Sequence, residues 1–144
     1  MIRTKPPFRA DHVGSFLRPA ALKDARAKRE RKEISADDLK KIEDREIENL
    51  IRRQEAIGLQ SITDGEFRRS WWHLDFLEGL DGVERYDMGQ GMAFSGGPTR
   101  AQGVRVTGKL GFTRHPMIDH FKFVQSRTGR TPKMAIPAPS ALYG

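Results

Sequence analysis

The sequence predicts an α/β fold with parallel strands, and three observations support this prediction. An amphipathic helix is expected over about residues 36–57, and Gly58 ends it. A short apolar strand follows and opens into a polar loop, which is the order of elements in a parallel α/β unit. A further apolar strand over 133–137 comes shortly before the end of the 144 residues. Because that strand lacks its next crossover, we expect the sequence to be the leading part of a larger α/β domain.

The first elements follow from local composition. Residues 8–15 are interpreted as a short strand running into a polar turn. Pro19 suits the start of a helix, and the Ala, Leu, Lys, Arg and Glu residues of 20–32 favour one. Ser35 is the expected N-cap of the second helix, with acids in its first turn. The apolar residues of that helix recur at helical spacing: Leu39, Ile42, Ile47, Leu50, Ile51 and Ile57.

The later elements are shorter. Residues 59–63 suit a buried strand, and 71–79 suit a short helix that ends at Gly79. Two strands, 82–86 and 104–107, are expected to flank a Gly-rich stretch, so that about 82–113 is either a hairpin or an insertion. A helix is expected over 116–127. Its apolar face would contain Met117, Ile118, Phe121 and Val124.

Composition excludes several classes of protein. Hydrophobic residues make up 37% of the chain, which is too many for a disordered tail. The absence of cysteine excludes a disulfide scaffold, a cysteine nucleophile and a thiolate metal site built from this chain. No apolar run has the length of a membrane span or of a secretory signal. We therefore expect a cytoplasmic protein without a membrane partner.

Basic charge is concentrated near the N-terminus. The formal net charge is +7, and residues 1–33 contain ten Lys and Arg against four acids. We interpret this cluster chiefly as a solvated helix face. An alternative function is a small basic module that binds an anion or a nucleic acid through phosphate contacts. Nucleic acid is the less favoured partner, because no recognition helix or aromatic RNA-binding strand accompanies the cluster.

Two polar loops follow predicted strands, at residues 11–15 and 64–66. In a parallel α/β fold the carboxyl ends of the strands face one side, so both loops are expected at one rim. Gly14 would let backbone N–H groups approach a ligand, and Ser15 adds a hydroxyl, which together suit a carboxylate. Glu66 could neutralise an ammonium group. The two loops therefore predict a clamp for a free amino acid.

Each of these signals has a structural alternative. Gly-Ser after a strand is usually a turn or an N-cap, and Asp11 and Asp64 could simply cap. His12 lies in the first loop, where a hydrogen-bonded structural role is as well supported as a binding role. His73 follows two tryptophans and is expected to pack. His115 and His120 are five apart on one expected helix, the wrong spacing for shared metal ligation.

Four segments carry a resemblance to a known family. They are Arg9-Ala-Asp-His-Val-Gly-Ser-Phe-Leu-Arg-Pro19, Ile62-Thr-Asp-Gly-Glu-Phe-Arg-Arg-Ser70, Trp72-His-Leu-Asp-Phe76 and Pro137-Ala-Pro-Ser140. Together they resemble the cobalamin-independent methionine synthases, and above all the short, single-barrel members that match the catalytic C-terminal half of the full enzyme. The resemblance runs from about residue 8 to the last residue, and the first two segments are specific in combination.

The resemblance implies a fold and a reaction. The fold would be the N-terminal portion of a (β/α)8 barrel that is incomplete in this chain, since a whole barrel takes about 200 residues or more. The reaction would be methyl transfer from 5-methyltetrahydropteroyl(tri)glutamate to homocysteine, which gives methionine. The family uses a zinc ion that binds the thiol and favours its thiolate.

The resemblance also implies roles for particular residues. Val13, Gly14 and Ser15 resemble the loop that holds the homocysteine carboxylate, and Glu66 resembles the glutamate that binds the amino group. His12 and Asp64 lie beside these residues and complete the candidate substrate-binding set.

The sequence departs from the family in its metal site. The family's zinc ligands, His, Cys, Glu and Cys, come from the later part of the barrel, and none can be matched here. His12 also differs from the full-length synthases. We therefore expect the chain alone to be catalytically inert, with a downstream segment or an oligomer to complement it. Another thiol or another methyl donor remains open.

Overall fold

The computed structural model describes residues 3, 5–88, 93–94, 97–98 and 102–138, and it divides into two compact units. The first unit comprises residues 1–69 and 119–135, and the second comprises 70–118 and 136–144. Most of the Gly-rich stretch expected after Met88, and the last residues from 139 on, lie outside the described residues.

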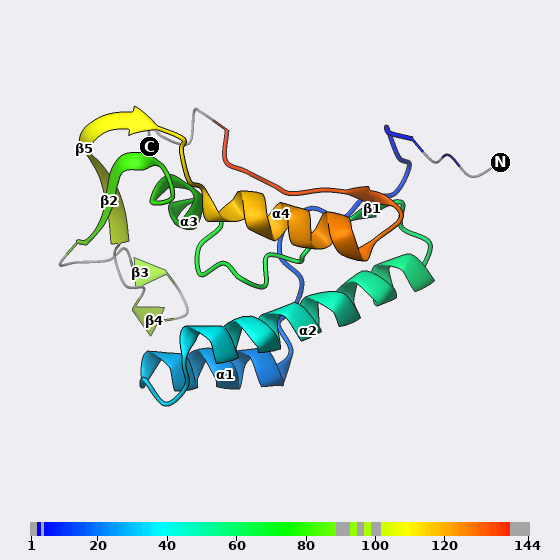
Figure 1. Ribbon diagram of the computed structural model, residues 1–144, viewed down its shortest axis with the longest axis horizontal. Helices are drawn as coiled ribbons and strands as arrows, with labels where there is room; N and C mark the ends of the chain where they lie inside the picture. The colour runs from blue at the N-terminus through cyan, green and yellow to red at the C-terminus, as the bar shows by residue number, and fades with distance from the viewer. Residues whose placement is uncertain (1–2, 4, 89–92, 95–96, 99–101, 139–144) are drawn as a thin grey trace. The chain divides into compact units, whose positions relative to one another are not determined.

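The first unit contains two helices that pack along each other, α1 (Ala20–Glu30) and α2 (Ala36–Ala56) (Figure 1). Ser35 and Asp38 form a reciprocal capping box at the start of α2, as the N-cap prediction required. Gly58 adopts a φ of +92° just after α2, which is the left-handed conformation predicted for it. The predicted helices are confirmed, apart from one or two residues at their C-terminal ends.

A two-stranded parallel sheet lies in the same unit. Strand β1 (Ser61–Ile62) pairs with β6 (Thr131–Pro132), and the Lys133 N–H extends the ladder by donating to the Ile62 carbonyl at 2.8 Å. The prediction of parallel strands is thus confirmed, but both strands differ from their expected ranges. The second begins two residues before the predicted 133–137, because pairing with residues 61–62 sets its register.

The strand predicted over residues 8–15 is wrong. No residue of that segment belongs to a ladder among the described residues. Side-chain hydrogen bonds hold the segment instead: Asp11 accepts one from Lys133, and Ser15 donates one to Glu66. A strand requires a neighbouring strand to satisfy its backbone groups, and no described strand forms a ladder with this segment.

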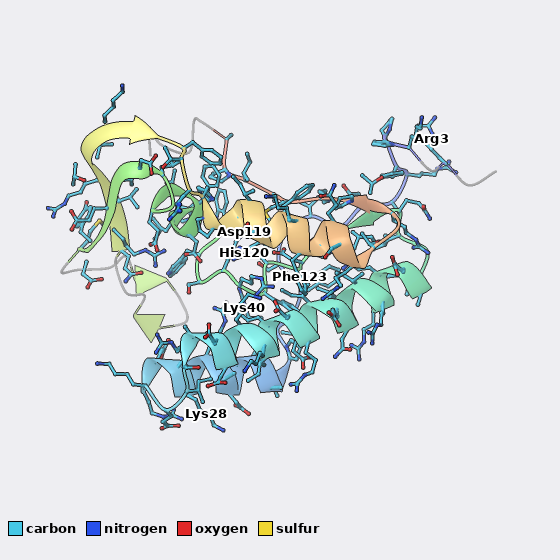
Figure 2. All side chains as sticks on the ribbon, in the orientation of Figure 1. Arg3, Lys28, Lys40, Asp119, His120 and Phe123 are labelled. Carbon is cyan, nitrogen blue, oxygen red and sulfur yellow. The ribbon has the colours of Figure 1, made fainter. Side chains whose placement is uncertain are left out.

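Helix α4 (Pro116–Arg127) has the predicted bounds, and from Asp119 on it belongs to the first unit. Figure 2 shows Phe123 of α4 close to Lys40 of α2, whose Nζ lies 6.0 Å from the ring centroid. The core of this unit consists of buried apolar residues from helices, strand and turn: Leu22, Ile47, Leu50, Ile51, Ile62, Phe67 and Val124. Because Phe67 belongs to this core and Phe16 packs against it, the core positions the two polar loops next to these residues.

The second unit contains the short helix α3 (Leu74–Leu77) and an antiparallel pair, β2 (Asp81–Asp87) and β5 (Gln102–Gly111). Strands β3 (Ala93–Phe94) and β4 (Gly97–Pro98) also pair antiparallel. Helix α3 is shorter than the predicted 71–79, because the Asp75 carboxylate accepts from the N–H groups of Ser70 and Trp71 before the helix begins.

Candidate functional site

The two polar loops singled out from the sequence meet in the first unit. The Ser15 hydroxyl donates to Glu66 Oε2 at 2.6 Å, and the Phe16 N–H donates to the Gly65 carbonyl at 3.2 Å. A small pocket of about 90 Å³ opens beside this junction. Its lining residues are His12, Val13, Gly14, Thr63, Asp64, Glu66, Lys133 and Ala135. The structure therefore brings together all the candidate residues, five of them in the pocket wall and Ser15 next to it.

Glycine at position 14 shapes the first wall of the pocket. Gly14 has a φ of +88°, a conformation that side chains disfavour, and its carbonyl lies 3.0 Å from His12 Nε2. The His12 ring stacks on Phe16 with 3.6 Å between the ring centroids. Val13 is 82% exposed. His12 therefore stabilises the loop through these two contacts, and it also lines the pocket.

The second wall is a turn of two consecutive left-handed residues, Gly65 with a φ of +66° and Glu66 with a φ of +57°. A Cβ at Gly65 would lie 2.4 Å from Leu50 Cδ2, so a side chain there would displace Leu50 in the core, and the positive φ also favours glycine. The Gly65 N–H donates to Thr63 Oγ1 at 2.8 Å, and the Glu66 N–H donates to Asp64 Oδ1 at 2.9 Å. The left-handed conformation of Glu66 costs on the order of 1 kcal/mol or more, which these contacts offset.

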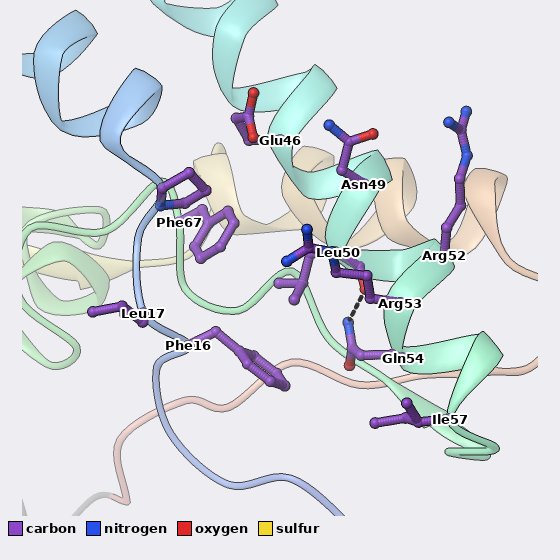
Figure 3. Close-up of a pocket in the computed structure, with 11 residues that line it drawn as sticks. Phe16, Leu17, Glu46, Asn49, Leu50, Arg52, Arg53, Gln54, Ile57 and Phe67 are labelled. Carbon is purple, nitrogen blue, oxygen red and sulfur yellow. Dashed lines mark hydrogen bonds between the residues drawn. The ribbon is translucent and has the colours of Figure 1, made fainter.

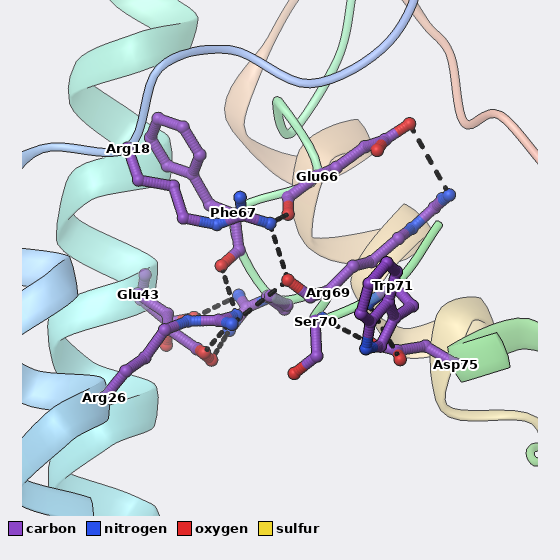
Figure 4. Close-up of polar contacts among 11 residues, drawn as sticks. Arg18, Arg26, Glu43, Glu66, Phe67, Arg69, Ser70, Trp71 and Asp75 are labelled. Atoms are coloured by element: carbon purple, nitrogen blue, oxygen red, sulfur yellow. Dashed lines mark hydrogen bonds and ion pairs between the residues drawn. The ribbon is translucent and has the colours of Figure 1, made fainter. Parts of the chain in front are cut away.

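A charged group and a hydroxyl, one on each oxygen, hold the Glu66 carboxylate. Glu66 is buried, with 6% of its surface exposed. Arg69 Nη1 lies 3.7 Å from Glu66 Oε1, and Arg69 Nη2 donates to the Ala135 carbonyl at 2.5 Å (Figure 4). The carboxylate thus keeps a fixed direction next to the pocket, with an arginine on one oxygen and a hydroxyl on the other.

Three contributors to the site were missed by the sequence analysis. Gln54, 1% exposed, accepts from the Thr63 N–H at 3.0 Å and donates to the Thr63 carbonyl at 2.8 Å. Lys133 donates to Asp11 Oδ1 at 2.6 Å and to the His12 carbonyl, and Arg69 holds Glu66. A sequence signal existed only for Gln54, a polar residue at the buried spacing of α2.

The basic cluster of residues 1–33 is only partly a solvated face. Arg18 and Arg26 are half-buried and donate to backbone carbonyls of the 64–69 turn. Arg31 stays exposed and pairs with Glu33. The interpretation as a solvated face is therefore wrong for Arg18 and Arg26. Their guanidinium N–H groups donate hydrogen bonds to turn carbonyls that have no partner in a helix.

A larger pocket of about 750 Å³ flanks α2 (Figure 3). Phe16 and Leu17 form one side, and Asn49 and Arg53 of α2, with Ile57 just after it, form the other. Leu17 and Ile57 are 87% and 75% exposed. No sequence pattern had indicated this hollow, which arises where the chain crosses α2 before α1 begins.

Burial changes the titration of the Asp64 carboxyl. Desolvation raises the pKa of Asp64 above its ordinary value, although the Glu66 N–H and the nearby arginines oppose the shift. A raised pKa in the folded state means that stability falls as pH rises through the interval between the pKa of the unfolded chain and that of the folded protein.

Asp64→Asn keeps the acceptor for the Glu66 N–H without the charge. The variant is expected to be more stable than the wild type in urea near pH 7, with a smaller difference near pH 4.

Asp44 provides the matched comparison with the opposite sign. Burial opposes ionisation of Asp44, but hydrogen bonds from Arg68 and Lys40 outweigh it and lower its pKa. Asp44→Asn should therefore lose stability near pH 7 and regain the difference as pH falls through the lowered pKa. If both variants change stability in the same direction near pH 7, the assignment of burial as the dominant cause at Asp64 is incorrect.

Among the residues that the structure describes, histidine and carboxylate side chains do not converge on a metal position. Within the described residues no group of three His, Cys, Asp or Glu side chains could hold a metal ion. His115 lies just before α4 rather than on the helix, with Nε2 2.8 Å from the Phe76 carbonyl. In the same described part of the chain, no helix has both the length and the apolar character that crossing a membrane requires.

Comparison with known proteins adds a family. The family model described as "Cobalamin-independent synthase, Catalytic domain" matches residues 8–110. The uncharacterized protein YxjH of Bacillus subtilis is 50% identical over 140 residues, which is 96% of this chain and 37% of that protein. A 5-methyltetrahydropteroyltriglutamate–homocysteine methyltransferase of Thermosynechococcus vestitus is 28% identical over 136 residues, 94% of this chain and 18% of that enzyme.

A solved structure gives the same result. The crystal structure of a putative vitamin-B12-independent methionine synthase from Listeria monocytogenes matches with a TM-score of 0.77 and 45% identity. The match covers 95% of this chain and 38% of the Listeria chain. This chain therefore spans well under half the length of these relatives.

Proposed function

Because the chain belongs to the family of the cobalamin-independent synthase catalytic domain, we propose that its first unit binds the amino-acid end of homocysteine for methyl transfer. The product of that reaction would be methionine, and the methyl donor would be 5-methyltetrahydropteroyl(tri)glutamate. The relative from Thermosynechococcus, whose name states this reaction, supports the substrates. Methyl transfer is the function of the whole domain, and amino-acid binding is the part that this chain's loops support.

The observation that carries the proposal is the junction between Ser15 and Glu66, 2.6 Å apart at the edge of a pocket. A buried carboxylate with a fixed direction attracts the ammonium group of an amino acid. The N–H groups near Gly14, whose backbone is left-handed, suit the carboxylate of the same ligand. The two poles of a zwitterion thus have partners on the two walls of one pocket.

Zinc is the cofactor that the family implies, and it would favour the thiolate of the substrate. The described residues do not fit it, because they contain no cluster of three metal-ligating side chains and the chain has no cysteine. The pocket wall contributes orientation of the amino acid, which holds its thiol in one direction.

The proposal is tested by Glu66→Gln. The substitution removes a charge-assisted contact, so homocysteine binding measured by calorimetry is expected to weaken by about 1.5–3 kcal/mol. 4-Mercaptobutyrate, which is homocysteine without its amino group, should bind wild type and variant equally. Glu30→Gln, an exposed change at the end of α1, is the control and should leave both affinities unchanged. An equal loss for the two ligands would refute the assignment of Glu66 to the ammonium group.

A further inference from the structure

The turn that presents Glu66 has most of its backbone acceptors satisfied by one segment of the chain, residues 16–26. Phe16 N–H donates to the Gly65 carbonyl at 3.2 Å, and Arg18 Nη2 donates to the Glu66 carbonyl at 2.9 Å. Arg26 donates to the Phe67 carbonyl at 2.6 Å. Both arginines also donate to the Arg69 carbonyl, at 2.6 and 3.0 Å. Figure 4 shows these two side chains pointing toward the turn.

These hydrogen bonds stabilise an uncommon backbone conformation at Gly65 and Glu66. Two consecutive left-handed residues, one of them not glycine, form a conformation that the isolated chain rarely adopts. Donors from outside the turn make that conformation favourable, because carbonyls turned away from a regular ladder would otherwise be unsatisfied. Charged donors form the stronger hydrogen bonds of this kind.

Arg18 is separated by only three positions from Ser15, which binds the Glu66 carboxylate. One short stretch of chain therefore contacts Glu66 twice, at its main-chain carbonyl and at its side-chain oxygen. Arg26 also forms an ion pair outside the turn, since its Nη2 lies 3.6 Å from Glu43 Oε1 on α2. Among the described residues Arg18 has no carboxylate partner, and its Nη2 donates to the Glu66 and Arg69 carbonyls of the turn.

From these contacts we infer that Arg18 is a positioning residue for amino-acid recognition: it sets the direction of Glu66 by holding the Glu66 and Arg69 carbonyls. The inference rests on the proposed binding of an amino acid by Glu66. Arg18 does not touch the ligand in this assignment. It acts through the backbone of the turn, and its removal changes where the Glu66 carboxylate points.

The experiment compares Arg18→Ala and Arg18→Lys with the wild-type chain. The quantity measured is the ratio of the dissociation constants for 4-mercaptobutyrate and L-homocysteine, which reports recognition of the ammonium group. Arg18→Ala is expected to reduce this ratio by roughly tenfold. Arg18→Lys should show a smaller reduction, because an ammonium group can reach one carbonyl but does not reproduce the two-carbonyl contact. A purely structural role would lower the folded fraction and the binding of both ligands together, with the ratio unchanged.

Arg29→Ala is the matched control, because Arg29 is an exposed arginine of α1 whose removal changes the net charge equally. It should leave the ratio as in the wild type. If Arg18→Ala does not fold, Arg18→Lys gives the answer, since an unchanged ratio in a folded Arg18→Lys chain, together with unchanged amide resonances, overturns the inference.

The two proposals can fail separately. If the wild-type chain does not prefer homocysteine over 4-mercaptobutyrate, the proposed function is wrong. The positioning role is then judged by the amide resonances of Gly65 and Glu66 in ¹H–¹⁵N spectra. These should shift in the Arg18 variants and stay in place in Arg29→Ala, and unshifted resonances in Arg18→Ala overturn the role.

Discussion

Replacing Arg68 by alanine is expected to lower the free energy of unfolding by about 3–5 kcal/mol. The Arg68 side chain is 5% exposed, and its guanidinium donates to Glu43 Oε2 at 3.1 Å and to Asp44 Oδ1. The same guanidinium lies 5.1 Å from the Phe123 ring centroid of α4. Its removal leaves two carboxylates of α2 without their shared partner and removes one contact between the 64–69 turn and Phe123 of α4. Urea unfolding near neutral pH measures the loss.

The pH dependence of this loss provides a second check. Burial raises the pKa of Glu43, and the charges of Arg68 and Arg26 oppose that shift. Without Arg68 the pKa of Glu43 rises further, so the variant takes up protons more readily when folded. The difference from wild type should therefore shrink as pH falls, because a protonated Glu43 is no longer a buried charge. A difference that grows in acid would contradict this account.

Arg45→Ala is the control for the Arg68 prediction. Arg45 lies on α2 with its side chain 60% exposed and contacts Glu46 at 3.1 Å. Exposed pairs of this kind contribute about 1 kcal/mol or less, since water and salt screen them. The same change of residue type should thus have a small effect there. Equal losses at the two positions would mean that burial does not govern the contribution of these arginines.

The second large effect is expected from Ile51→Ala, which should lower the free energy of unfolding by about 2–5 kcal/mol. Ile51 is 1% exposed in the core formed with Leu22, Ile47 and Ile62. The substitution removes three buried carbon atoms, and the two packed helices around the cavity can collapse only in part. Calorimetric or urea unfolding measures the change.

Ile57→Ala is the exposed control for the Ile51 prediction. Ile57 is 75% exposed directly after α2, so its truncation should change stability by about 0.5 kcal/mol or less.

Homocysteine binding measured on the folded fraction of Ile51→Ala should match the wild type, because Ile51 does not line the small pocket. A variant with wild-type stability and abolished binding would contradict the core assignment.

Elements with strong local signals could be predicted from the sequence. The capping box at Ser35 and the periodic apolar residues of α2 depend only on neighbours within one or two turns of helix. Helix α4, with Pro116 at its first position, was predicted with its observed bounds for the same reason. Strands depended on partners far along the chain, so residues 8–15 were wrongly assigned and β6 was displaced by two residues.

The candidate site divides in a similar way. The residue types at positions 12–15 and 64–66 were identifiable from the sequence, because glycine, serine and acid residues after apolar segments are visible in order. The residues that hold these loops in place could not be identified from the sequence. Arg18 and Arg26 looked like members of a solvated basic helix, and only their hydrogen bonds to the 64–69 turn reveal another use.

The sequence by itself determined the helices, the parallel α/β character and the two loops that carry polar chemistry. Tertiary structure alone decided that Ser15 touches Glu66, across 51 positions, and that Gln54 holds Thr63. The physical reason is range. Helix caps and amphipathic spacing act between residues a few positions apart, whereas a buried hydrogen bond between distant segments exists only after the core has brought them together.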